Sequence, residues 1–141
     1  MTITIDRSTD FGQRVQRHLE HNRIVWLTTL DSSGAPQPRP VWFLWDGAEF
    51  LIYSRPEAHK VDHIRANPQV ALNFDSDEYG GDVVVLTGEA RLVPDEPPAK
   101  DNAAYAAKYA EGIAGLDMTP ESFGETYSVA IRVRPDNLRG H

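Results

Sequence analysis

The chain has 141 residues, no cysteine, and 21 acidic against 14 basic side chains, which gives a formal net charge of −7. Without cysteine the chain cannot form disulfides, use a catalytic thiolate or bind zinc or iron–sulfur clusters through sulfur. The acidic balance disfavours a nucleic-acid partner. The sequence has no run of roughly 18 consecutive apolar residues, which a membrane span needs, and no signal peptide. We therefore expect no membrane association and one cytoplasmic domain over residues 1–141.

The N-terminal half of the chain predicts one helix followed by strands in hairpins. Apolar residues recur at helical spacing between residues 10 and 21, and Ser8 or Thr9 can cap that helix. Runs rich in β-branched, aromatic and proline residues then predict extended backbone, over residues 24–30, 36–45 and 49–54. The dipeptide Asp46-Gly47 is a hairpin signal and predicts the turn before the last of these strands.

The C-terminal half mixes helices and strands. Helix-forming residues predict helices over residues 58–67 and 99–113, followed by a short helical turn around Glu121. Apolar runs predict further strands, over residues 70–75, 82–93 and 127–134. Residues 135–141 are expected to be less regular. A mainly β pattern of hairpins with peripheral helices favours an antiparallel barrel over a parallel α/β sheet.

The stretch from Tyr53 to Lys60 carries the clearest chemical signal, because it joins a predicted strand to a predicted helix. The first amides of a helix have no partner within the helix and favour an anion, so a phosphate placed there would also meet the charge of Lys60. His59 and Ser54 could add hydrogen-bond donors. The simpler alternative is that Lys60 is a solvated residue on a helix surface.

A second stretch, residues 39–45, combines a basic residue with two tryptophans. Strand backbone beside Val41 and Trp42 could hydrogen-bond the edge of a planar heterocycle, while Trp42 or Trp45 could cover a ring face. Arg39 could contact a phosphate or ribityl oxygens. The alternative is that both tryptophans belong to the core or to a dimer interface.

Other polar clusters are weaker signals. His59 and His63 lie four residues apart, and His18 and His21 three apart, which are spacings that can bind a metal. Surface histidines explain both pairs more simply, so we expect no metal site. The acidic residues between positions 75 and 82 are interpreted as a solvated loop.

Three segments together resemble the pyridoxamine 5′-phosphate oxidase-like split-barrel family, and most closely its small actinobacterial branch usually described as F420-dependent. They are residues 38–47, residues 53–74 with Tyr53-Ser54 and His59-Lys60, and residues 87–93. The resemblance implies an antiparallel split β-barrel that binds FMN or the deazaflavin F420 at the interface of a homodimer.

The resemblance also implies a set of cofactor-binding residues. Arg39 matches the arginine that opens the strand beside the isoalloxazine ring, and Lys60 matches the phosphate-binding lysine. His59 stands where many members have arginine, Ala58 where the oxidase has serine, and Asp82 near a glutamine of the FMN oxidase. The implied set is Arg39, Pro40, Val41, Trp42, Phe43, Leu44, Tyr53, Ser54, Ala58, His59, Lys60 and Asp82.

The expected function is that of an F420-dependent oxidoreductase that transfers a hydride to a conjugated small molecule such as a quinone or a tetrapyrrole. Vitamin B6 oxidation is not expected, because Leu44 replaces the substrate-binding lysine of that enzyme and residues 133–141 lack a clear match to its arginine–histidine pair. Tyr79, Tyr127 or solvent could supply a proton. The alternatives are an FMN-dependent member of the same fold, a non-catalytic F420 carrier, and a structural dimer without a ligand.

Overall fold

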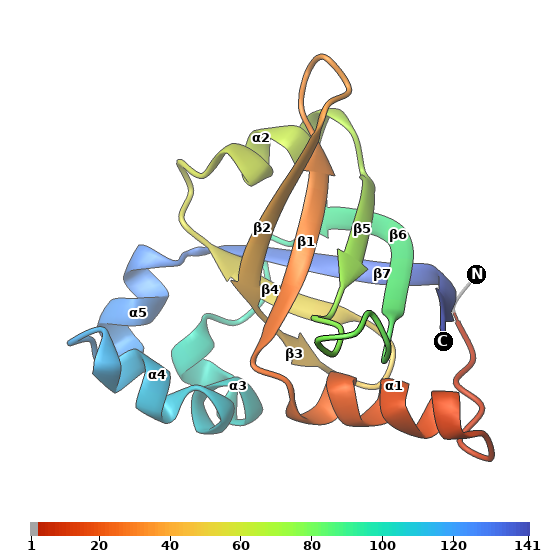
Figure 1. Cartoon of the computed structure of the whole chain (residues 1–141). Helices are drawn as coiled ribbons and strands as arrows, with labels where there is room; N and C mark the ends of the chain where they lie inside the picture. The colour runs from red at the N-terminus through yellow and green to blue at the C-terminus, as the bar shows by residue number, and fades with distance from the viewer. Residues whose placement is uncertain (1–2) are drawn as a thin grey trace.

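The computed structural model describes residues 3–141, and within that range the chain forms a seven-stranded sheet in the spatial order β2-β1-β5-β6-β7-β4-β3 (Figure 1). The strands are β1 Ile24–Leu30, β2 Pro36–Trp42, β3 Leu44–Trp45, β4 Phe50–Ser54, β5 Gln69–Asn73, β6 Val84–Leu92 and β7 Val129–Gly140. All neighbouring strands are antiparallel. Because β1, β2 and β5 run across β4 and β7, the sheet folds over its own core, which confirms the predicted antiparallel split barrel.

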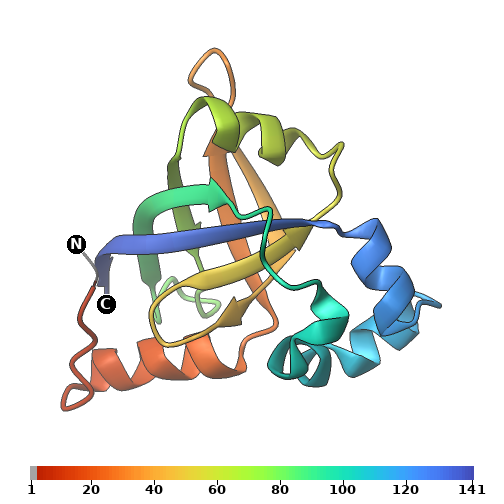
Figure 2. The ribbon, with the colours of Figure 1, turned by 180° about the vertical axis from the view of Figure 1, so that it is seen from behind.

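The helices lie around this barrel rather than between its strands. They are α1 Asp10–His21, α2 His59–Ala66, the 3-10 helix η1 Ala99–Asp101, α3 Ala103–Lys108, α4 Ala110–Gly115 and α5 Pro120–Thr126. Figures 1 and 2 show α2 at one end of β1 and β2, α1 near their other end, and α3, α4 and α5 grouped to one side of the sheet. None of the helices in residues 3–141 is long and apolar enough to span a membrane.

Local sequence signals located several elements well. The helix α1 spans the predicted residues, and the Thr9 side chain caps it by accepting a hydrogen bond from the Gly12 amide at 2.9 Å. The strand β1 also coincides with the predicted residues 24–30. The turn at residues 46–49 is closed by a hydrogen bond from the Asp46 amide to the Glu49 carbonyl at 3.1 Å, as the hairpin signal predicts.

Strand β4 separates two apolar clusters and therefore connects the barrel core with the region that holds the candidate site. All five of its residues are buried. Phe50 and Ile52 face the main core, whereas Leu51 and Tyr53 pack with residues of the helical group α3–α5. The alternation of side chains along a strand produces this division. A strand covered on both faces explains why this segment is apolar at almost every position.

The predicted helix over residues 99–113 is broken in the structure into η1, α3 and α4. Asn102 ends the 3-10 segment and starts α3, because its side chain accepts a hydrogen bond from the Tyr105 amide at 3.0 Å. Helix α3 ends at Lys108, and Tyr109 separates it from α4. The prediction of one continuous helix was wrong, because amino-acid composition does not show where a side chain such as that of Asn102 accepts a hydrogen bond from a backbone amide and so starts a new helix.

The predicted strand over residues 41–45 is interrupted at Phe43, which belongs neither to β2 nor to β3. The Phe43 amide donates to the Tyr109 hydroxyl at 2.8 Å, and the Phe43 carbonyl accepts from Lys108 Nζ at 2.7 Å. The Tyr109 hydroxyl also lies 2.6 Å from the Arg23 carbonyl oxygen. Side chains of the helical group therefore take the backbone hydrogen bonds that a neighbouring strand would otherwise supply.

Replacing Tyr109 by phenylalanine is expected to destabilise the fold by about 1–3 kcal/mol, because it leaves the buried Phe43 amide without an acceptor. Chemical denaturation of the two proteins measures this difference. The matched control is Tyr79→Phe, which removes the same hydroxyl from a side chain that is 88% exposed and should leave stability unchanged. Equal stability of the Tyr109 variant and the wild type would show that the hydroxyl does not support the strand break.

The tail was expected to be irregular, but residues 135–140 continue β7, whose register against β6 reaches Gly140. The register shifts between Thr87 and Gly88, which accommodates Pro135 in the strand. A Cβ on Gly88 would lie 2.2 Å from the Arg134 carbonyl oxygen, so the close approach of the two strands requires glycine there. Pairing with β6 therefore keeps the chain extended beyond Pro135, although proline usually interrupts a strand.

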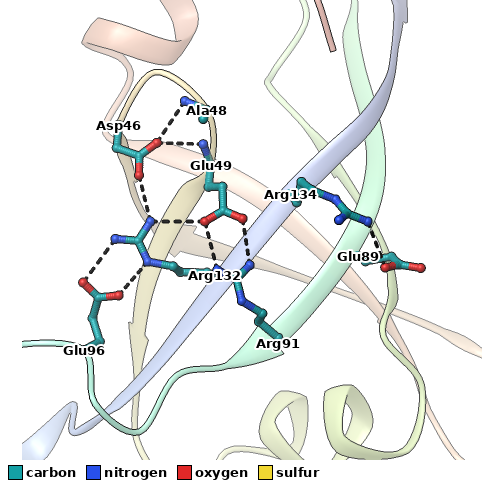
Figure 3. A network of polar contacts seen from close by, with 8 residues as sticks. All are labelled: Asp46, Ala48, Glu49, Glu89, Arg91, Glu96, Arg132 and Arg134. Atoms are coloured by element: carbon teal, nitrogen blue, oxygen red, sulfur yellow. Dashed lines mark hydrogen bonds and ion pairs between the residues drawn. The ribbon is translucent and has the colours of Figure 1, made fainter. Parts of the chain in front are cut away.

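A network of ion pairs ties β7 to the turn between β3 and β4 (Figure 3). Arg132 donates from Nε to Glu96 at 2.6 Å and from Nη1 to Asp46 at 2.8 Å, and its side chain is only 18% exposed. Glu49 lies 3.4 Å from the same Nη1 and pairs with Arg91 at 2.7 Å. One largely buried guanidinium thus holds three carboxylates from two separate segments together.

Candidate functional site

A groove lies between the β1–β2 hairpin and the start of α2. It has a volume of about 450 Å³. We call it the basic groove, and its lining residues are Thr29, Asp31, Gln37, Arg39, Pro40, Ala58, His59, Lys60 and His63. Figure 1 shows why distant segments meet here: α2 packs beside the ends of β1 and β2 that the hairpin joins. Arg39 and Lys60 therefore face one shared groove.

Two cations of the groove are available to an anion. Within residues 3–141 neither Arg39 nor Lys60 forms a salt bridge with a carboxylate. Partial burial of Lys60, followed by the nearby positive charge of Arg39, lowers the pKa of the lysine. Both effects disfavour the charged ammonium in the free protein, and a bound anion would oppose them because its negative charge favours the charged form.

The one carboxylate that lines the groove is committed elsewhere. Asp31 accepts hydrogen bonds from the Ser33 hydroxyl, the Ala35 amide and the Gln37 side chain at 2.7–3.0 Å. The Ser33 hydroxyl and the Ala35 amide lower the pKa of Asp31 to about 2. These bonds fix the carboxylate in the hairpin turn, so it serves the turn rather than neutralising the two cations.

The start of α2 adds backbone donors to the groove. The N-cap residue Ala58 has no side chain that could accept a hydrogen bond from the first helical amides. The helix therefore begins beside Arg39 and Lys60 without a side-chain cap, in the geometry that favours an anion.

The sequence pointed to His63 only as a possible metal ligand, and no motif marks Thr29 as a residue of the site. The His63 imidazole Nδ1 lies 2.8 Å from the Thr29 hydroxyl, which orients the ring, and the ring stacks on that of His59 at a centroid distance of 6.4 Å. The four-residue spacing of the histidines was the signal that could have identified His63, because it places both side chains on one helix face.

A second hollow continues from the basic groove, sharing Pro40 and Lys60 with it. We call it the aromatic cavity; its volume is about 280 Å³ and its lining residues are Pro40, Val41, Trp42, Tyr53, Lys60, Tyr105, Leu116, Phe123 and Tyr127. Of the lining residues in or beside the helical group, the sequence pointed only to Tyr127, as a possible proton donor; Tyr105, Leu116 and Phe123 carry no recognisable motif.

Most of the predicted cofactor residues line one of these two hollows. They are Arg39, Pro40, Val41, Trp42, Tyr53, Ala58, His59 and Lys60. Of the two tryptophans, Trp42 lines the aromatic cavity, whereas Trp45 packs edge-on against Phe50 in the barrel. Of the two candidate proton donors, Tyr127 lines the cavity, whereas Tyr79 is 88% exposed on a loop.

Four predicted residues lie outside both hollows. Phe43 and Ser54 are buried, and Leu44 packs against the helical group. The Ser54 hydroxyl donates to the Arg55 carbonyl at 2.9 Å, so it is turned into its own backbone.

Asp82 is the fourth of these residues. Its carboxylate pairs with Arg14 at 2.9 Å and with His18 at 3.0 Å, which holds it against α1. This pairing explains why Asp82 is not brought to the groove that Arg39 and Lys60 share.

Comparisons with known proteins agree with this architecture. The family model described as pyridoxamine 5′-phosphate oxidase matches residues 11–141. The general stress protein 26 of Bacillus subtilis (strain 168) is 31% identical over 132 residues, which cover 92% of this chain and 87% of that protein.

Solved structures share the fold over most of their length. A structure titled F420 reductase superposes with a TM-score of 0.67 at 26% identity, covering 88% of this chain and 94% of that one. A putative pyridoxamine 5′-phosphate oxidase from Listeria innocua also superposes with a TM-score of 0.67, at 23% identity over 90% of this chain and 94% of that one.

Proposed function

The chain belongs to the pyridoxamine 5′-phosphate oxidase family, and from that premise we propose that it is an oxidoreductase that uses the deazaflavin F420. The observation that carries the proposal is the shared groove of Arg39 and Lys60, which begins at the N-terminus of α2 and opens into a cavity lined with aromatic rings. A phosphate-bearing cofactor with a flat ring needs both features. We further propose that the working protein is a homodimer.

The residues of the groove fit the phosphate of such a cofactor. Lys60 and Arg39 would supply charge, and the uncapped amides at the start of α2 would supply directed donors. His59 and His63 line the same wall. Asp31, the one carboxylate of the lining, is held in the hairpin turn by hydrogen bonds and forms no salt bridge with Arg39 or Lys60.

The chain's own contribution to the reaction is binding, orientation and exclusion of water. When bound, the cofactor would supply hydride transfer, which requires no nucleophile from the protein. Trp42, Tyr53 and Phe123 form apolar walls that would keep water from the reacting atoms. A proton, where the acceptor needs one, would come from Tyr127 or from solvent.

F420 is preferred to FMN because a structure titled F420 reductase is similar at 26% identity over 88% of this chain. An FMN-dependent enzyme is the second candidate, since a phosphate groove does not discriminate the two rings. A carrier that binds F420 without turnover is the third candidate, and the small number of acid–base groups in the cavity favours it.

Titration of the purified protein with F420 and with FMN, side by side and followed by the quenching of tryptophan fluorescence, is expected to give the tighter dissociation constant for F420. Tighter binding of FMN would replace the proposal by its second candidate, and binding of neither cofactor would refute it. Steady-state turnover with reduced F420 and a panel of conjugated acceptors separates an enzyme from a carrier, and sedimentation measures the expected dimer.

A further inference from the structure

Helix α4 carries a glycine at a position where a helix favours alanine, and the ring of Trp42 lies directly against it. Gly112 is in the middle of α4 and has no positive φ that would require glycine. Glycine at such a position lowers helix stability relative to alanine. A Cβ atom there would lie 2.9 Å from Cη2 and 3.1 Å from Cζ2 of the Trp42 indole. The absence of a side chain on Gly112 therefore leaves room for the indole.

Neighbouring rings restrict the movement of the Trp42 indole. Tyr109, at the start of α4, stacks on it at a centroid distance of 4.6 Å with an interplanar angle of 2°. Phe123 of α5 also stacks on the indole, at 5.6 Å. Because residues three apart share one face of a helix, the first turn of α4 supplies both a stacking ring, from Tyr109, and the space beside Gly112.

The backbone that carries Trp42 is fixed by the same helical group. The next residue, Phe43, donates its amide to the Tyr109 hydroxyl at 2.8 Å, and its carbonyl accepts from Lys108 Nζ at 2.7 Å. The Lys108 ammonium also lies 3.7 Å from the centroid of the Phe43 ring. A shift of this strand end away from α4 would break these contacts, so the indole is held against Gly112 from the backbone side as well.

We propose that Gly112 is a positioning residue for the cofactor ring, because it sets, through Trp42, the shape of the aromatic cavity. The inference rests on the proposed function, which assigns that ring to the cavity. A methyl group at position 112 would have to displace the indole or push α4 outward. Either shift alters the cavity, because Trp42 and Leu116, the C-cap of α4, both line it. A cavity of about 280 Å³ is small for a ligand site and tolerates little narrowing.

Two alanine substitutions on α4 test the inference by calorimetric titration with F420 and with FMN. Gly112→Ala is expected to weaken the binding of whichever cofactor the wild type binds by at least roughly fivefold, the lower end of the cost of inserting a methyl group into a packed site. Gly115→Ala is the matched control on the same helix. A Cβ atom at Gly115 would meet nothing within 4 Å, so this variant should bind the cofactor as the wild type does.

A double-mutant cycle with Trp42→Phe separates positioning from general damage to the fold. Phenylalanine lacks the Cη2 and Cζ2 atoms that a methyl group at position 112 would meet. Adding Gly112→Ala to Trp42→Phe should therefore leave the cofactor affinity of Trp42→Phe unchanged.

Near-ultraviolet circular dichroism of the cofactor-free protein gives a second measurement. Gly112→Ala should change the spectrum, because it disturbs the packing of the indole on Tyr109. The change should be absent in the Trp42→Phe background, and Gly115→Ala should keep the wild-type spectrum.

Two outcomes overturn the inference alone. One is a Gly112→Ala protein that binds the cofactor as tightly as the wild type, in which case the proposed function still stands. The other is an equal loss of affinity, or of the fold itself, with and without the indole, which would show that Gly112 does not act through Trp42. Binding of neither cofactor by the wild type is a separate result, which removes the proposed function and this inference together.

Discussion

Replacing Lys60 by methionine is expected to weaken the binding of F420 or FMN roughly 10- to 150-fold, which corresponds to the loss of about 1.5–3 kcal/mol from a charged hydrogen bond. Methionine keeps the apolar stem and removes the ammonium. The effect should be large because Lys60 is half-buried beside Arg39, where water screens the phosphate less than at an open surface. Titration with each cofactor measures the change in dissociation constant.

The same substitution should not weaken the cofactor-free fold. Burial and Arg39 lower the pKa of Lys60 in the folded chain, so the unfolded chain binds that proton more readily. The charge therefore opposes folding at neutral pH, and the stability that it withholds returns as the pH rises from the lowered pKa toward the ordinary value. Lys60→Met should thus melt at or above the wild-type temperature.

Lys100→Met is the matched control for the cofactor titration. Lys100 is exposed in η1 and lies outside the basic groove, so its loss should leave cofactor affinity unchanged. If Lys60→Met binds cofactor as tightly as the Lys100→Met control and the wild type do, the phosphate does not bind at the start of α2 and the proposed function fails.

Replacing Arg132 by methionine is expected to destabilise the protein by about 3 kcal/mol, because Glu96, Asp46 and Glu49 would lose the guanidinium that holds them together (Figure 3). This value lies at the low end for a broken buried ion pair, since the arginine side chain remains 18% exposed. Denaturant unfolding at neutral pH measures the loss.

The loss should also depend on pH. Burial alone would raise the pKa of Asp46, but the Glu49 amide and Arg132 bring it below its ordinary value. Arg91 first, and Arg132 after it, lower the pKa of Glu49 against the opposing effect of burial. Carboxyls with lowered pKa values stabilise the fold above about pH 4 and lose that contribution as the pH falls. The gap between wild type and variant should therefore narrow in acid.

Arg134→Met is the matched control, two residues along the same strand. Arg134 pairs with Glu89 at 3.1 Å, but both side chains are more than 40% exposed, so the pair should contribute less than about 1 kcal/mol. A loss for Arg132→Met no greater than that for Arg134→Met would show that the network of Figure 3 adds nothing beyond ordinary surface pairing.

The sequence by itself determined the elements whose signals are local. Helix α1 follows from apolar spacing and the Thr9 cap, and β1 follows from a run of β-branched and aromatic residues. These signals involve residues within one or two turns of each other, so no distant partner is needed to interpret them. The resemblance of residues 38–47 and 53–74 to a known family was equally local, and it identified Arg39 and Lys60.

Other features were decided only by the tertiary structure, because they depend on contacts between residues that are far apart in the chain. Residues 135–140 join β7 because β6 pairs with them, and Phe43 leaves the sheet because Tyr109 and Lys108 take its backbone hydrogen bonds. Arg39 and Lys60 share a groove because α2 packs against β1 and β2, and Tyr105 lacks a hydrogen-bond partner among the described residues because β4 and the helical group enclose it. Each outcome is settled by competition for hydrogen bonds and buried space between distant segments, which no local pattern records.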